Sequence, residues 1–114
     1  MARYRGLTLR LLGKRAPAMG PGKAELVERI AETGSISAAA RAMGMSYRRA
    51  WQLVEALNKD YREPVVATAI GGTRGGGASV TPFGMRLVRL FRAMEDKASA
   101  AIAADLRRFT RYIS

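Results

Sequence analysis

The segment from Gly34 to Leu57, GSISAAARAMGMSYRRAWQLVEAL, places two short amphipathic patterns on either side of one glycine. Ser35 or Ser37 suits the cap of the first pattern, a face of small residues that ends before Gly44, and Ser46 suits the cap of the second. The apolar positions of the second pattern recur at steps of three and four residues: Tyr47, Ala50, Trp51, Val54 and Leu57. The segment therefore predicts two short helices joined by a tight turn at Gly44.

The flanking residues predict a single domain that is mainly α-helical with a small β-hairpin. Alternation of polar and apolar residues indicates a strand at about 5–12, followed by a loop to residue 20. Pro21 begins a first helix, so residues 21–63 form a three-helix unit. Two β-branched runs joined by glycines predict a hairpin over 64–81, and Thr81 with Pro82 begins a long helix over 82–114.

Composition excludes several classes of function. The chain of 114 residues has no cysteine and no histidine, so the commonest metal ligands and the commonest general acid and base are missing. We therefore expect no enzyme, no catalytic or metal site and no cofactor. No apolar run is long enough to cross a bilayer, and the N-terminus lacks the apolar core of a secretory signal, so we expect a cytoplasmic protein without a membrane partner.

The charge distribution favours an anionic polymer as the partner. The net charge is +11, and residues 33–54 carry three arginines and no acidic residue. Residues 1–24 and 64–94 also lack acidic residues, whereas the acids cluster at 25–32, 55–63 and 95–105. The basic segments include the predicted pair of short helices.

Two helices that cross over a turn with Ala40 and Gly44 at the contact form a helix-turn-helix, and the second helix then faces the ligand. Arg48, Arg49 and Gln52 are suited to base edges in a DNA major groove. The serine hydroxyls are suited to backbone phosphates: Ser35, Ser37 and Ser46. We expect Tyr47 and Trp51 to be held by packing. The alternative is an ordinary helical hairpin with a solvated basic face.

The glycine-rich tip of the predicted hairpin, IGGTRGGGAS, would bring Arg74 to phosphates or to the minor groove. This segment does not match a nucleotide-binding loop, because no Lys-Ser or Lys-Thr pair follows it and its glycines lie between predicted strands. The alternative is a turn whose arginine is only solvated.

The terminal helix, about 30 residues and about 45 Å long, exceeds what so small a domain covers. Its first half, around Phe83 and Leu87, is expected to pack internally, and the rest of its apolar stripe predicts a two-fold dimer. The residues that we expect at this dimer interface, together with the first strand, are Leu9, Phe91, Met94, Ala98, Ile102, Leu106 and Phe109.

The run GSISAAARAMGMSYRRAWQLVEALN, followed by GGTRGGGASVTPFG, closely resembles the DNA-binding domain of the ModE family of molybdate-responsive regulators. It is more distantly similar to the winged helix of LysR-type regulators. The resemblance spans about Leu7 to Ala98. It implies a dimeric winged helix-turn-helix, joined through the first strand and the last helix, that binds double-stranded DNA and controls molybdate-uptake and molybdoenzyme genes. It also implies that Ser46, Tyr47, Arg48 and Arg49 lie at the DNA, with Arg74 on the wing.

Full-length members of that family continue into molybdate-binding domains after the long helix, whereas these residues end at Ser114. We therefore expect no molybdate-binding domain in residues 1–114, and molybdate stays open as an effector. Two other functions stay open as well. One is a sequence-independent architectural DNA-binding protein, and the other is an interaction module that pairs with a full-length paralogue.

Overall fold

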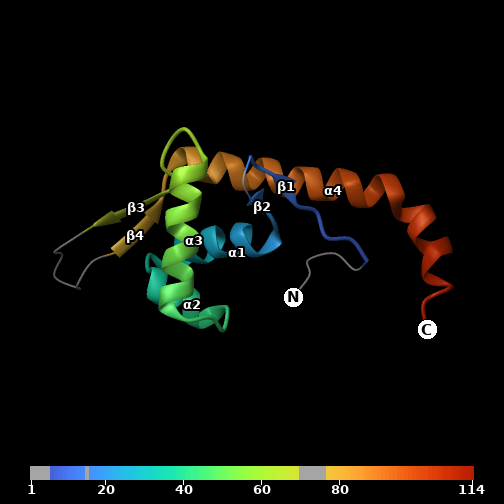
Figure 1. The fold of residues 1–114 in the computed structure, drawn as a ribbon, viewed down its shortest axis with the longest axis horizontal. Coiled ribbons are helices and arrows are strands. Elements are labelled where there is room, and N and C mark those ends of the chain that lie inside the picture. The colour runs from blue at the N-terminus through green and yellow to red at the C-terminus, as the bar shows by residue number, and fades with distance from the viewer. Residues whose placement is uncertain (1–5, 15, 70–76) are drawn as a thin grey trace.

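The computed structural model describes residues 6–14, 16–69 and 77–114, and Figure 1 shows their arrangement. Three helices form one end of the molecule, a hairpin extends from it, and a long helix runs across it and beyond. The elements in chain order are β1 (Leu11–Leu12), β2 (Pro17–Met19), α1 (Pro21–Thr33), α2 (Ile36–Ala42), α3 (Tyr47–Asp60), β3 (Val66–Ala69), β4 (Gly77–Val80) and α4 (Pro82–Thr110). The predicted fold class, mainly α-helical with a hairpin and a long last helix, is confirmed.

The turn between α2 and α3 follows from the caps that the sequence predicts. The Ser35 hydroxyl accepts a hydrogen bond from the Ala38 amide, and the Ser46 hydroxyl accepts one from the Arg49 amide, each at 3.0 Å. Gly44 has φ of 68°, in the left-handed region that side chains disfavour. A four-residue connection therefore turns the chain from α2 into α3.

The hairpin of β3 and β4, here called the wing, is antiparallel with Val66 opposite Val80 and Ala69 opposite Gly77. Asn58 near the end of α3 holds its base. The side-chain oxygen of Asn58 accepts hydrogen bonds from the amides of Val65 and Val66, and its side-chain nitrogen donates to the Val66 carbonyl. The Ala78 amide donates to the Gly34 carbonyl at 3.0 Å, so β4 is also tied to the turn between α1 and α2.

The N-terminal segment differs from the expectation of one strand at about 5–12 followed by loop. Within its described part, strand structure is limited to Leu11–Leu12, which pairs with Pro17–Met19 in a region expected to be loop. Met19 is buried because this second strand lies against the core. The Tyr61 hydroxyl donates to the Ala18 carbonyl at 2.8 Å, and burial raises the pKa of Tyr61, with a smaller contribution from the negative charge of Asp60.

Helix α4 has two unlike halves. All four of its buried residues lie in the first half: Gly84, Val88, Phe91 and Glu95. The expectation that Phe91 lies at a dimer interface is wrong, because its ring is fully buried in the core of its own chain. From Asp96 to Thr110 no residue of the helix is buried, and Phe109 is 66% exposed. Within the described ranges, no helix combines the length and the apolar composition that crossing a bilayer requires.

Gly84 lies in the first turn of α4, where this helix passes close to the backbone of Val65 at the base of the wing. A Cβ atom at this position would lie 2.5 Å from the Val65 carbonyl oxygen, a contact that real Cβ atoms do not make. Thr81, whose hydroxyl caps α4 by accepting from the Gly84 amide, also bonds the carbonyl oxygens of Pro64 and Val65. The close approach of α4 to the base of the wing therefore depends on a residue without a side chain.

We predict that Gly84→Ala lowers the free energy of unfolding by roughly 1–3 kcal/mol, because the backbone of Val65 must move to admit the methyl group. Chemical denaturation followed by circular dichroism measures this change. Gly22→Ala in α1 is the matched control, since no atom lies within 4 Å of the added Cβ. That variant should be as stable as the parent or more stable, because alanine is the better helix former. Equal stabilities of the two variants would contradict the prediction.

Candidate nucleic-acid interface

Helix α3 presents four different surfaces, because successive side chains are about 100° apart around a helix. Ala50, Val54 and Leu57 are fully buried and hold the helix on the core. On the opposite side, Arg48, Gln52 and Lys59 are exposed. Two flanks separate these sides, and they carry chemically different residues.

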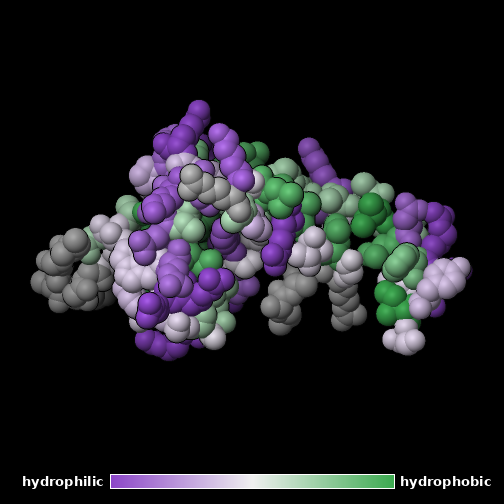
Figure 2. All heavy atoms as spheres, in the orientation of Figure 1, coloured by the Kyte–Doolittle hydropathy of each residue, from purple (hydrophilic) through white to green (hydrophobic). Residues whose placement is uncertain are grey.

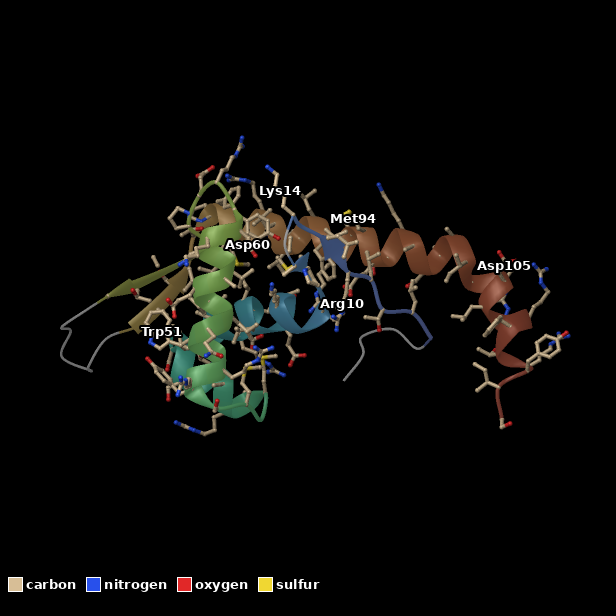
Figure 3. The ribbon with its side chains drawn as sticks, in the orientation of Figure 1. Arg10, Lys14, Trp51, Asp60, Met94 and Asp105 are labelled. Carbon is tan, nitrogen blue, oxygen red and sulfur yellow. The ribbon has the colours of Figure 1, made fainter. Side chains whose placement is uncertain are left out.

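The wing-side flank of α3 consists of Tyr47 and Trp51, one helical turn apart. The expectation that packing holds both residues is wrong: Tyr47 is 51% exposed and Trp51 is 37% exposed. Figure 3 shows Trp51 on the side of α3 that faces the wing. The three- and four-residue spacing places these rings beside the buried stripe rather than in it, so each keeps a large part of its surface in solvent.

The other flank of α3 lines a groove of about 500 Å³ between α3, β2 and the start of α1. Arg49 and Gln52 line this groove from α3, and Arg10 and Lys23 line it from the N-terminal part of the chain. The Lys23 ammonium donates to the Pro17 carbonyl at 2.7 Å. Sequence reasoning missed Arg10 and Lys23, because each is distant from the helix-turn-helix in the chain and only folding brings them beside Arg49.

Of the three serines predicted to face DNA, two cap helices and one is exposed on a helix surface. Ser35 and Ser46 both cap helices, and Ser37 is exposed in the first turn of α2. Arg48 and Arg49 are exposed in the first turn of α3, directly after its cap Ser46. The prediction for Arg74 falls within 70–76 and so lies outside the described residues.

Electrostatics distinguish this end of the molecule from the rest. In the described part of the chain, the ion pairs of Arg29, Arg62, Arg92 and Arg108 all involve carboxylates outside residues 33–54. Arg41, Arg48 and Arg49 take part in none of these pairs. Figure 2 shows hydrophilic residues gathered over the three-helix end, and hydrophobic residues along the far half of α4. The acid-free segment therefore forms a surface with unneutralised positive charge, suited to phosphates.

A cluster of charged side chains joins this unit to α4. The Arg92 guanidinium donates to both carboxylate oxygens of Glu28 on α1, at 2.7 and 3.2 Å, and to Glu95 one turn along α4 at 2.8 Å. The Glu95 side chain is almost entirely buried. Hydrogen bonding to Glu28 raises the pKa of Arg92, while burial opposes that shift. Because Arg92 neutralises the buried carboxylate, α4 is fixed against α1.

No group of three carboxylate side chains gathers as a metal site within residues 6–14, 16–69 and 77–114. The structure contains a helix-turn-helix with an exposed cationic helix and a two-stranded wing beside it. This arrangement is a winged helix-turn-helix. The model of bacterial regulatory helix-turn-helix proteins of the lysR family matches residues 22–85. The chain belongs to this family.

Curated relatives include regulators named ModE and proteins whose names refer to molybdenum. The molybdenum-pterin-binding protein MopB of Rhodobacter capsulatus is 46% identical over 80% of this chain and 33% of its own length. The molybdenum transport protein ModE of Azotobacter vinelandii is 35% identical over 75% of this chain and 32% of its own. The DNA-binding transcriptional dual regulator ModE of Escherichia coli K12 is 39% identical over 62% of this chain and 27% of its own. The chain thus spans about a third of the length of these relatives, and the predicted ModE resemblance is confirmed.

Solved structures share the fold. ArgP from Mycobacterium tuberculosis matches with a TM-score of 0.53 at 25% identity, over 76% of this chain and 30% of that one. The full-length LTTR LysG from Corynebacterium glutamicum, with bound effector Arg, matches with a TM-score of 0.56 at 25% identity, over 82% of this chain and 30% of that one. The winged helix-turn-helix is therefore the part that this chain shares with longer regulators.

We predict that replacing Arg48 and Arg49 together by alanine reduces sequence preference in DNA binding and leaves the fold intact, because both side chains are exposed. Each lost base contact should reduce discrimination by roughly 1–3 kcal/mol. Titration of a preferred and a scrambled duplex at one salt concentration gives the ratio of their dissociation constants, and circular dichroism checks the fold.

The matched control removes two exposed arginines from α4, Arg86 and Arg89. It should weaken binding to both duplexes alike and keep their ratio, because it changes charge away from α3. A preserved ratio in the Arg48 and Arg49 variant would contradict the assignment, and loss of helix content would show that these arginines are structural.

Proposed function

We propose that this chain is a ModE-like transcriptional regulator that binds double-stranded DNA as a homodimer in the cytoplasm and controls molybdate-transport or other molybdenum-related genes. The observation that carries the proposal is the exposed, acid-free surface of α2 and α3, with the wing beside it. Family membership supports DNA binding, and the names of the relatives support the link with molybdenum.

The surface of α3 is suited to a major groove in both shape and charge. Arg48 and Gln52 project from its exposed side, and Arg49 projects over the groove shared with Arg10 and Lys23. A major groove about 12 Å wide admits one α-helix, and arginine and glutamine side chains recognise base edges there. The cations around the groove and on α2 would then contact phosphates on either side. The wing, tied to the end of α3 by Asn58, would lie over the adjacent backbone.

The second half of α4 supports a homodimer. The helix has 29 residues and is about 43 Å long. Beyond Glu95 none of its residues is buried, although Ala98, Ile102 and Leu106 continue the apolar stripe and are half-buried. Leu106 packs against the backbone at Gly6, so the N-terminal segment runs along this part of α4 (Figure 1). Leu9 packs against the core of its own chain, while Met94 and Phe109 keep exposed apolar surface for a second copy.

Selection from a pool of random duplexes at near-physiological salt tests the proposed function directly. We expect enrichment of a two-fold symmetric motif, because each subunit of a dimer would recognise one half-site. Matches to the motif should lie upstream of molybdate-transport genes, and the selected duplex then allows molybdate to be tested as an effector. Retention without enrichment would favour an architectural DNA-binding protein. Tight binding only with a full-length paralogue present would favour the interaction module, and no retention would contradict DNA binding.

We predict that Ile102→Glu converts the dimer into a monomer, because it places a carboxylate in the apolar stripe of α4. Analytical ultracentrifugation should give twice the 12.4 kDa chain mass for the parent and the single mass for the variant. Ala104→Glu is the matched control, because residue 104 is exposed and lies on the opposite side of the helix. It should stay dimeric. A variant at Ile102 with unchanged mass would contradict the proposed interface.

A further inference from the structure

Trp51 and Tyr47 form an apolar patch on a surface that is otherwise polar and cationic. Trp51 is the only tryptophan of the chain, and its side chain is 37% exposed beside a 51% exposed Tyr47. Rings of this size usually bury most of their surface or mark a contact site, and these two lie in the first half of α3, next to Arg48. Ala50 and Val54 are buried in the core of the chain, whereas the outer surfaces of both rings are exposed to solvent.

We propose that the patch of Tyr47 and Trp51 recognises thymine methyl groups in the DNA major groove and thereby contributes to sequence specificity; this inference rests on the proposed function. Among the four bases of DNA, thymine alone presents a methyl group in that groove, and side chains recognise it by apolar contact. Tyr47 and Trp51 therefore add a base-specific apolar contact to the hydrogen bonds that Arg48 and Gln52 supply.

Charge complementarity identifies DNA, rather than an apolar protein surface, as the occupant of this patch. Residues 33–54 contain Arg41, Arg48 and Arg49 and no acidic residue, so a partner that covers the rings must also accept positive charge around them. A major groove does so, because its thymine methyl groups lie between two rows of phosphates. Burial of the two rings against protein would instead leave these arginines to be desolvated without counter-charges.

The position of Trp51 also separates its contacts from those of Arg49. Trp51 faces the wing (Figure 3), whereas Arg49 lines the groove on the other flank of α3. With α3 in a major groove, the two flanks would face opposite walls of that groove. The two aromatic residues would thus recognise bases toward the wing side of each half-site, away from the bases nearest Arg49.

Replacement of thymine by uracil in the selected duplex tests this inference, because uracil lacks only the methyl group. We expect substitution at one or two positions in each half-site to weaken binding by the wild-type protein about fourfold per position, the effect of one buried methyl group. Binding should also protect the Trp51 fluorescence from quenching by acrylamide. The double variant Tyr47→Ala with Trp51→Ala should bind the thymine and uracil duplexes equally, and Trp51→Phe should keep part of the difference.

Glu55→Ala is the matched control, one turn further along the exposed part of α3. It should change affinity through charge and keep the thymine-to-uracil ratio. If the wild-type protein binds the duplex but no uracil position weakens binding, the inference is wrong while the proposed function stands. If acrylamide quenching of the Trp51 fluorescence changes on self-association but not when DNA is added, the patch contacts a second copy of the chain instead. Absence of any duplex binding would instead overturn the proposed function.

Discussion

The ion cluster of Arg92 with Glu28 and Glu95 determines how the two parts of this molecule are joined. Arg92 bridges α1 to α4 through two hydrogen bonds to Glu28 and one to the almost fully buried Glu95. A buried carboxylate is strongly unfavourable unless it is paired, so these groups must stay together when the chain folds. Because α4 is proposed to carry the dimer contacts and α1 supports α2 and α3, this cluster would set the direction of each DNA-facing helix within a dimer.

Backbone and amide hydrogen bonds fix the wing in a comparable way. Asn58 satisfies two amides and one carbonyl at the start of β3, and the Gly34 carbonyl receives the Ala78 amide of β4. Both anchors lie on elements that hold α3: the end of α3 itself and the turn before α2. These hydrogen bonds therefore hold strands β3 and β4 against the helices that carry the proposed DNA contacts.

The helix-turn-helix was predictable from local signals, whereas the surroundings of its side chains were not. Ser35, Ser46 and Gly44 act over a few residues, so their roles follow from cap and turn chemistry. Periodicity places Trp51 with the apolar residues of α3, but it does not say how wide a stripe the core covers. The core covers a narrow stripe, and Trp51 lies at its edge. Phe91 shows the opposite case, since the core extends further along α4 than expected.

The sequence by itself determined the order and type of the main elements, the caps, the acid-free basic segment and the kinship with ModE-like regulators, because these depend on local chemistry and composition. Only the tertiary structure decided which apolar residues are covered and which distant residues meet. It paired Leu11–Leu12 with Pro17–Met19, brought Arg10 and Lys23 beside Arg49, and enclosed Glu95 with Arg92. Each of these contacts depends on the relative placement of several elements, and packing of the whole core sets that placement.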